Sequence, residues 1–228
     1  MIKYLKRNIE KLRKKIRKNE FHGSATYWEN RYKQGGNSGA GSYNRLAEFK
    51  ANIINDFCVK NNIEKVIEFG CGDGNQLTLA KYQQYIGLDV SKKSIELCNN
   101  MFANDATKQF YELNKVNLSN NKFHSSLAIS LDVIFHLIED DVYYVYMNNL
   151  FNASSKYVII YASNYEAKTL ALHVKHRCFT DYVFDKFPKF KLIKVVKNKY
   201  PFECNNPNNT SFSDFYFFQK KESLKKNN

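Results

Sequence analysis

Apolar positions follow two alternating patterns along most of the chain. From residue 65 onward, short apolar runs rich in β-branched residues alternate with stretches of helical spacing. The runs that predict strands are 66–69, 85–88, 109–113, 127–131 and 157–161, and the helical stretches between them are 77–81, 94–102 and 142–151. This alternation is typical of a parallel sheet that is covered by helices on both faces.

Two later apolar runs lack a helix between them. They span 191–196 and 213–218, and the chain between them is polar and turn-rich. We therefore predict an α/β fold with a mostly parallel sheet that ends in a C-terminal antiparallel strand pair.

The N-terminal segment, residues 1–20, has a different pattern. Its apolar residues fall at i, i+4, i+7 and i+11, which gathers them on one helical face: Leu5, Ile9, Leu12 and Ile16. Residues 1–18 carry nine basic side chains against one acid, a net charge of +8 out of +13 for the chain. A basic amphipathic helix follows. Such a helix could bind an anionic membrane surface or RNA, or it could pack on the domain itself or on a partner subunit. We favour packing on the domain or a partner subunit, with the basic face in solvent.

The length of 228 residues fits one folded domain, residues 21–228. A glycine-rich segment, 34–42, precedes a predicted helix over 46–57, and it fits a mobile lid or a linker. The chain holds no apolar run long enough for a membrane span and no signal-peptide pattern, so we expect a cytoplasmic protein. Five widely spaced cysteines without a C-x-x-C pair predict free thiols and no metal site.

The chemistry-bearing segment follows the first strand. Residues 68–76 read Glu-Phe-Gly-Cys-Gly-Asp-Gly-Asn-Gln, with glycines at alternate positions before a helix. Glycine permits a tight turn and lets a ligand approach the backbone. Asp89 ends the next strand, where a carboxylate accepts hydrogen bonds from ribose hydroxyls. The arrangement predicts a nucleoside site.

The spacing of the glycines narrows the class of nucleoside cofactor that fits. A dinucleotide fingerprint is G-x-G-x-x-G, whereas the third glycine here comes one residue early. Glu68 at the start of the turn would repel a phosphate but would hold an ammonium group. A cationic, phosphate-free cofactor fits better.

These residues resemble motif I, E-x-G-x-G-x-G, of the class I S-adenosylmethionine-dependent methyltransferases. The resemblance implies a Rossmann-like seven-stranded sheet and S-adenosyl-L-methionine as cofactor, with S-adenosyl-L-homocysteine as product. It implies cofactor contacts from Glu68, Gly70, Gly72, Gly74, Gln76, Asp89, Val90 and Leu131.

A second element resembles the Y-W-x-x-R-Y stretch that precedes motif I in several small-molecule methyltransferases. It reads Tyr27-Trp-Glu-Asn-Arg-Tyr32. The resemblance implies an N-terminal lid over residues 21–45, with Tyr27, Trp28 and Arg31 closing the cofactor site. An aromatic pair in the core beside a surface arginine is the open alternative.

The catalytic candidates are Asp132 and His136, which come after the fourth strand. The resemblance places this segment beside the methyl group. His136 is our first choice of general base for a hydroxyl acceptor, because an unperturbed histidine titrates near neutrality. Asp132 orients it, contacts the cofactor or acts as the base itself. A structural histidine is the alternative.

A narrower resemblance is to methyltransferases of bacterial surface-polysaccharide gene clusters, some of which are thought to methylate sugars or capsule phosphoramidate. It rests on residues 39–50, 173–177 and 210–216. It implies O-methylation of a small acceptor, anionic or sugar-linked, such as a phosphorylated compound or a nucleotide or sugar conjugate. The substrate-binding candidates are Tyr43, Arg45, His173, His176 and Arg177, although a solvated basic face explains the last three equally well.

Two rival functions remain open. An RNA or DNA methyltransferase fits the net charge, yet the chain lacks the [D/N]-P-P-[Y/F] and Pro-Cys signatures of the adenine-amino and cytosine-C5 enzymes. A scaffold that binds the cofactor without transferring its methyl group is the other rival. The sequence leaves the oligomeric state open, and it allows peripheral membrane contact through residues 1–18.

Overall fold

The computed structural model describes residues 21–167 and 169–222. The predicted basic helix, residues 1–20, lies outside this range, so its prediction stays open. Within these two ranges no helix is both long enough and apolar enough to cross a membrane.

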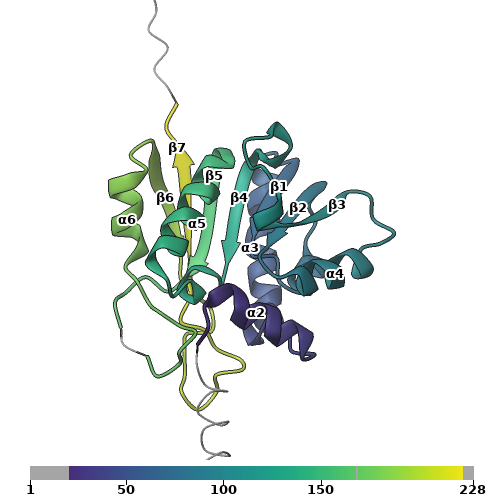
Figure 1. Ribbon diagram of the computed structural model, residues 1–228. Coiled ribbons are helices and arrows are strands. Elements are labelled where there is room, and N and C mark those ends of the chain that lie inside the picture. The colour runs from purple at the N-terminus through teal and green to yellow at the C-terminus, as the bar shows by residue number, and fades with distance from the viewer. Residues whose placement is uncertain (1–20, 168, 223–228) are drawn as a thin grey trace, which may run out of the picture.

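A seven-stranded sheet forms the centre of the molecule, in the order β3-β2-β1-β4-β5-β7-β6 (Figure 1). The strands are β1 Lys65–Phe69, β2 Gln84–Asp89, β3 Lys108–Glu112, β4 Ser125–Leu131, β5 Ser154–Ala162, β6 Phe190–Val196 and β7 Asp214–Lys220. The first five pair in parallel, and β7 runs antiparallel to both β5 and β6. The predicted fold class is confirmed, including the antiparallel end of the sheet.

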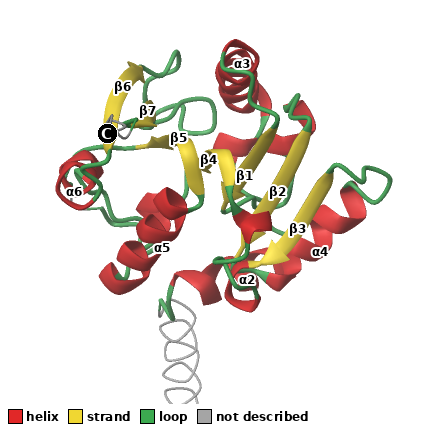
Figure 2. Ribbon diagram, turned by 90° about the horizontal axis from the view of Figure 1, so that it is seen from above, coloured by secondary structure: helices red, strands yellow, loops and turns green. Residues whose placement is uncertain are grey.

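Alternation along the strands divides the core into two layers. Ile67 and Phe69 of β1 join one apolar cluster with α5 (Asp140–Asn152) and α6 (Phe179–Lys186). Val66 joins the other with α3 (Asn44–Lys60) and α4 (Lys92–Met101). Successive side chains of a strand point to opposite faces, so an apolar run requires cover on both sides. Figure 2 shows α5 and α6 on the face opposite α3.

The helix predicted over 77–81 is shorter than expected. The chain forms one 3₁₀ turn, η2 (Gln76–Leu79), and is extended again at Ala80. Only 14 residues, 70–83, join β1 to β2, and the glycine turn takes the first of them. The remaining length suffices for a single turn that buries Leu77.

The parallel strands end at one edge of the sheet, where the helix α2 (Ser24–Lys33) also lies. Ligand sites of open parallel sheets form at this edge, outside the carboxyl ends of the strands. The fold therefore brings the glycine turn, Asp89 and the segment after β4 together beneath α2.

Candidate functional site

A cavity of about 860 Å³, its open mouth included, lies between α2 and the carboxyl ends of β1, β2 and β4. Most of the predicted cofactor residues line it: Trp28, Glu68, Gly70, Gly72, Gln76, Asp89, Val90 and Leu131. Asp132 and His136 line the same cavity.

The glycine turn forms one wall. Gly70, Gly72 and Gly74 have φ values of 81°, 60° and 82°, a region that favours glycine. A Cβ atom at Gly72 would collide with the hydroxyl of Ser38, which shows how closely the glycine-rich segment 34–42 packs on the turn. Gly74 instead faces α4, where a Cβ would lie 3.1 Å from Cys98 Sγ. Gly74 therefore permits packing behind the turn.

Asp89 lies at the end of β2 with both carboxylate oxygens bound. Oδ2 accepts from the backbone N–H of Gly72 at 3.0 Å, and Oδ1 accepts from that of Ser91 at 2.9 Å. Burial raises the pKa of Asp89, and these backbone donors oppose the rise. The carboxylate also lines the cavity, where a ligand hydroxyl can reach it.

Glu68 is buried on β1 and accepts a hydrogen bond of 2.7 Å from the Tyr85 hydroxyl. Burial raises the pKa of Glu68 to about 7, although Tyr85 and the nearby Lys50 oppose the rise. A carboxyl group with such a pKa ionises readily when a cationic ligand enters.

Gln76 contributes an unsatisfied acceptor. Its Nε2 donates to the Ala47 carbonyl at 3.0 Å, while its Oε1 is buried and lacks a partner among the described residues. Buried polar atoms nearly always have a hydrogen-bond partner, so an unpartnered acceptor in a cavity wall indicates a donor on the ligand. An ammonium group would satisfy both Gln76 and Glu68, which fits the amino acid end of S-adenosylmethionine.

His136 ends the 3₁₀ turn η5 (Ile134–His136) and is partly buried. Its Nδ1 lies 2.7 Å from the carbonyl oxygen of His173. Because a carbonyl only accepts, Nδ1 carries the proton of the neutral ring and Nε2 keeps its lone pair. Burial lowers the pKa of His136 to about 4, so the ring is neutral at physiological pH. The expectation that it titrates near neutrality was wrong, because desolvation disfavours the charged ring. Trp28 packs edge-on against it at 4.9 Å between ring centroids.

Asp132, directly after β4, is a charged centre that the sequence did not fully reveal. Its carboxylate accepts from Lys50 Nζ and from Ser213 Oγ, each at 2.8 Å. Lys50 also lines the cavity. Neither Lys50 nor Ser213 lies in a recognisable motif, and a lysine within the helical apolar pattern was the only signal for the first.

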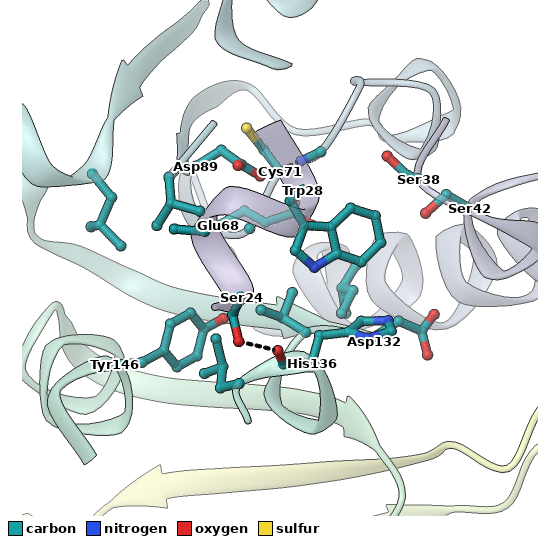
Figure 3. Close-up of a pocket in the computed structure, with 18 of the residues that line it drawn as sticks. Ser24, Trp28, Ser38, Ser42, Glu68, Cys71, Asp89, Asp132, His136 and Tyr146 are labelled. Atoms are coloured by element: carbon teal, nitrogen blue, oxygen red, sulfur yellow. Dashed lines mark hydrogen bonds between the residues drawn. The ribbon is translucent and has the colours of Figure 1, made fainter. Parts of the chain in front are cut away.

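The helix α2 is held by hydrogen bonds at its N-terminus and in its second turn. At its N-terminus, Ser24 Oγ lies 2.7 Å from the His136 carbonyl oxygen (Figure 3), and Ser24 N donates to Glu139 at 2.8 Å. In its second turn, Glu29 accepts from Ser91 Oγ at 2.6 Å and from Lys93 N at 3.1 Å. Trp28 and Tyr32, on the same helix, line the cavity. The helix therefore covers the site as a lid would.

Asp73 binds the glycine-rich segment to the turn. Its Oδ2 accepts from Ser38 N and from the Tyr43 hydroxyl, both at 2.8 Å. Asp73 N donates to Ser38 Oγ at 2.9 Å in return. The hydroxyl of Tyr43, which was predicted to bind substrate, thus donates its hydrogen bond within the protein. Asp73 was missed because an acid inside a glycine turn has no distinctive spacing.

Several predicted ligand contacts lie outside the lining of this cavity. Arg31 Nε donates to the Asn37 carbonyl at 2.6 Å, and Tyr27 stacks on His173 at 4.6 Å. Arg45 Nε donates to the Asn209 carbonyl at 2.7 Å and lies over the ring of Tyr200. Their predicted roles in binding stay predictions.

The basic cluster after β5 is likewise engaged by the protein. His176 Nδ1 lies 2.7 Å from Ser163 Oγ. Arg177 donates to the Leu137 carbonyl and pairs with Asp140, each at 2.8 Å. These side chains fasten the loop after β5, and their predicted grip on an anionic acceptor stays a prediction.

Three solved structures illustrate the similarity of this fold to known proteins. The methyltransferase domain of bacterial CtHen1 is 17% identical, with a TM-score of 0.60 over 78% of this chain and 100% of that domain. Magnesium protoporphyrin IX methyltransferase from Synechocystis with bound S-adenosylmethionine is 14% identical, with a TM-score of 0.59 over 89% and 100% of the two chains. The N-methyltransferase NodS from Bradyrhizobium japonicum with S-adenosylhomocysteine is 11% identical, with a TM-score of 0.58 over 78% and 87%.

Comparison of the sequence with family models and with curated proteins gives no match. The structural similarity, at these low identities, concerns the fold. The chain has the fold of the class I S-adenosylmethionine-dependent methyltransferases.

Proposed function

We propose that this protein is an S-adenosylmethionine-dependent methyltransferase that acts on the hydroxyl of a small acceptor. One observation carries the proposal: a single cavity joins the glycine turn and Asp89 to His136, whose Nε2 lone pair is free of the proton. Figure 3 draws Asp89 and Asp132 on opposite sides of Trp28, and both residues line this one cavity.

The contacts described above indicate which residues would bind the cofactor. Asp89 would hold the ribose hydroxyls, while Glu68 and Gln76 Oε1 would accept from the ammonium group. The bound cofactor supplies an activated methyl group on a sulfonium, so the protein mainly has to align the acceptor and exclude water.

His136 would serve the acceptor. Its Nε2 accepts a hydrogen bond from the acceptor hydroxyl and takes the proton as the oxygen attacks. The His173 carbonyl holds the ring in the required tautomer. Closure by α2 would keep bulk water from competing with the acceptor.

The identity of the acceptor rests on the resemblance. A sugar hydroxyl is the first acceptor to test, and a capsule phosphoramidate is the second. The net charge of +13 favours RNA as another acceptor class, to be tested by methyl transfer to bulk RNA. Transfer to RNA at rates above those for small acceptors would displace the proposal.

Calorimetric titration with S-adenosylmethionine, S-adenosylhomocysteine and NAD tests the cofactor. We expect micromolar binding of the first two only, and Asp89→Ala should weaken it by roughly 1.5–3 kcal/mol through loss of charge-assisted hydrogen bonds. Asp56→Ala, on the exposed side of α3, is the matched control. Equal affinity of wild type and Asp89→Ala for the cofactor would show that Asp89 does not bind it. Tight binding without turnover on any acceptor would favour the scaffold.

A further inference from the structure

Lys50 is a charged side chain in the interior of α3. It is 0% exposed, and the residues that share its buried face are mostly apolar. Burying an ammonium group is costly unless it is paired. Its Nζ lies 2.8 Å from Asp132 Oδ2 and 5.4 Å from the centre of the Tyr161 ring.

The partner of Lys50 has an unusual backbone. Asp132 has a φ of 59°, in the left-handed region that is uncommon for residues other than glycine. Its N–H donates to the Tyr161 carbonyl at 2.8 Å, and Ser213 Oγ donates to Oδ1 at 2.8 Å. A strained residue persists when its surroundings determine its conformation, and such residues concentrate at functional sites.

The close approach of another segment strengthens the constraint. A Cβ at Gly41 would lie 2.6 Å from Asp132 Oδ2, so a side chain there would displace the carboxylate. The carboxylate is therefore held by hydrogen bonds from α3 and from the segment before β7, and Gly41 packs closely beside it. Both donors lie about 80 positions from Asp132, and they hold its carboxylate at the cavity wall.

The cavity favours one kind of acceptor beside this carboxylate. Each oxygen of Asp132 has one protein donor and retains a lone pair toward a ligand. A hydroxyl or amine can donate a hydrogen to it, whereas a phosphate or carboxylate brings like charge. Lys50, the cation on the same wall, is already paired with Asp132, and His136 is neutral, so neither offers an unpaired positive charge to an anion.

We propose that Asp132 binds the N–H or O–H group of a neutral or cationic acceptor, and that Lys50 and Ser213 are positioning residues that hold its carboxylate in place. This inference rests on the proposed function and narrows it: the acceptor's reacting group is a hydrogen-bond donor and carries no negative charge.

The test compares two cofactor analogues by calorimetry. Sinefungin has an amino-bearing carbon where S-adenosylmethionine has its methylated sulfonium, and S-adenosylhomocysteine has neither group. A fixed carboxylate at the transfer point should make sinefungin bind about tenfold more tightly. Asp132→Asn should reduce this preference to about threefold or less and leave the affinity for S-adenosylhomocysteine within about twofold.

A double-mutant cycle tests Lys50. Lys50→Met should lower the sinefungin preference at least about threefold when Asp132 is present and leave it unchanged in Asp132→Asn. A merely structural lysine would alter both backgrounds or neither. Lys60→Met, at the exposed end of α3, is the control. If Lys50→Met does not fold, Ser213→Ala removes the second donor without unpairing Lys50, and it should lower the preference in the same background-dependent way.

Failure of this inference differs from failure of the proposed function. Loss of binding to every analogue by the wild type would overturn the cofactor proposal. Tight S-adenosylhomocysteine binding with equal sinefungin affinity, or a preference unaffected by Asp132→Asn, would overturn the role of Asp132. Inorganic phosphate binding to the S-adenosylhomocysteine complex, weakened by Lys50→Met, would show an anionic acceptor instead.

Discussion

The imidazole of His136 donates its Nδ1 proton to the backbone carbonyl of His173, across 2.7 Å. The two residues are 37 positions apart, and their rings also stack at 5.5 Å between centroids. The loop after β5 thereby fixes the tautomer of a side chain that follows β4. In that tautomer Nε2 is an acceptor, which is the state that a general base requires.

His136→Ala should lower turnover by roughly 10²- to 10⁴-fold, the usual contribution of general base catalysis. Cofactor affinity should change little, because the imidazole has no charge to lose at neutral pH. Initial rates with any productive acceptor, together with calorimetry, would measure both. His124→Ala, an exposed histidine, is the control. Wild-type turnover in His136→Ala would make His136 structural.

His136 and Glu68 should give opposite dependences of stability on pH. The pKa of His136 falls from 6.5 to about 4, so its contribution is complete above pH 6.5 and is lost as the pH falls through 4. The pKa of Glu68 rises from 4.5 to about 7, so its contribution is complete below pH 4.5 and is lost as the pH rises through 7. Between pH 4.5 and 6.5 the two effects oppose each other.

Denaturant unfolding of His136→Gln and Glu68→Gln at several pH values would reveal this opposition. Relative to wild type, His136→Gln should lose stability as the pH rises from 4.5 to 6.5, and Glu68→Gln should gain it, each by about 2 kcal/mol. Parallel curves for wild type and either variant would show that the group does not titrate as its burial implies.

The two attachments of α2 should control how long the cofactor stays bound. Ser24→Ala removes the contacts to Glu139 and the His136 carbonyl, and Glu29→Gln weakens those to Ser91 and Lys93. Each change should reduce the free energy that holds α2 over the cavity by about 1 kcal/mol. Release of S-adenosylhomocysteine should then be severalfold faster in stopped-flow experiments. Thr26→Ala, on the exposed face of α2, should release it at the wild-type rate.

Tyr43→Phe distinguishes a structural role of this tyrosine from the predicted contact with substrate. Loss of the hydrogen bond to Asp73 should lower the free energy of unfolding by about 1 kcal/mol and speed proteolysis within residues 34–42, with KM for the acceptor unchanged. A raised KM at wild-type stability would support the contact with substrate.

Deletion of residues 1–18 should leave cofactor binding intact if this basic segment is peripheral to the domain. Calorimetry with S-adenosylhomocysteine and the thermal midpoint of both proteins would show it. A deleted protein that does not fold would place the segment in the core.

Local patterns determined the strands, the α/β class and the glycine turn with Asp89, the proposed nucleoside end of the cavity. A buried parallel strand must be apolar on both faces, and a tight turn beside a ligand needs glycine, so both leave a trace in neighbouring residues. For this reason Glu68, the three glycines and Asp89 were recognisable as a group from their spacing alone.

Only the tertiary structure decided the acceptor end. Lys50, Asp132 and Ser213 are separated by about 80 residues on either side, and the carbonyl that fixes His136 belongs to His173. Ion pairs and backbone carbonyls impose no spacing on the sequence, because the sheet edge brings their partners together after folding. The same packing gave partners within the protein to four residues that the sequence had suggested as substrate-binding: Tyr43, Arg45, His176 and Arg177.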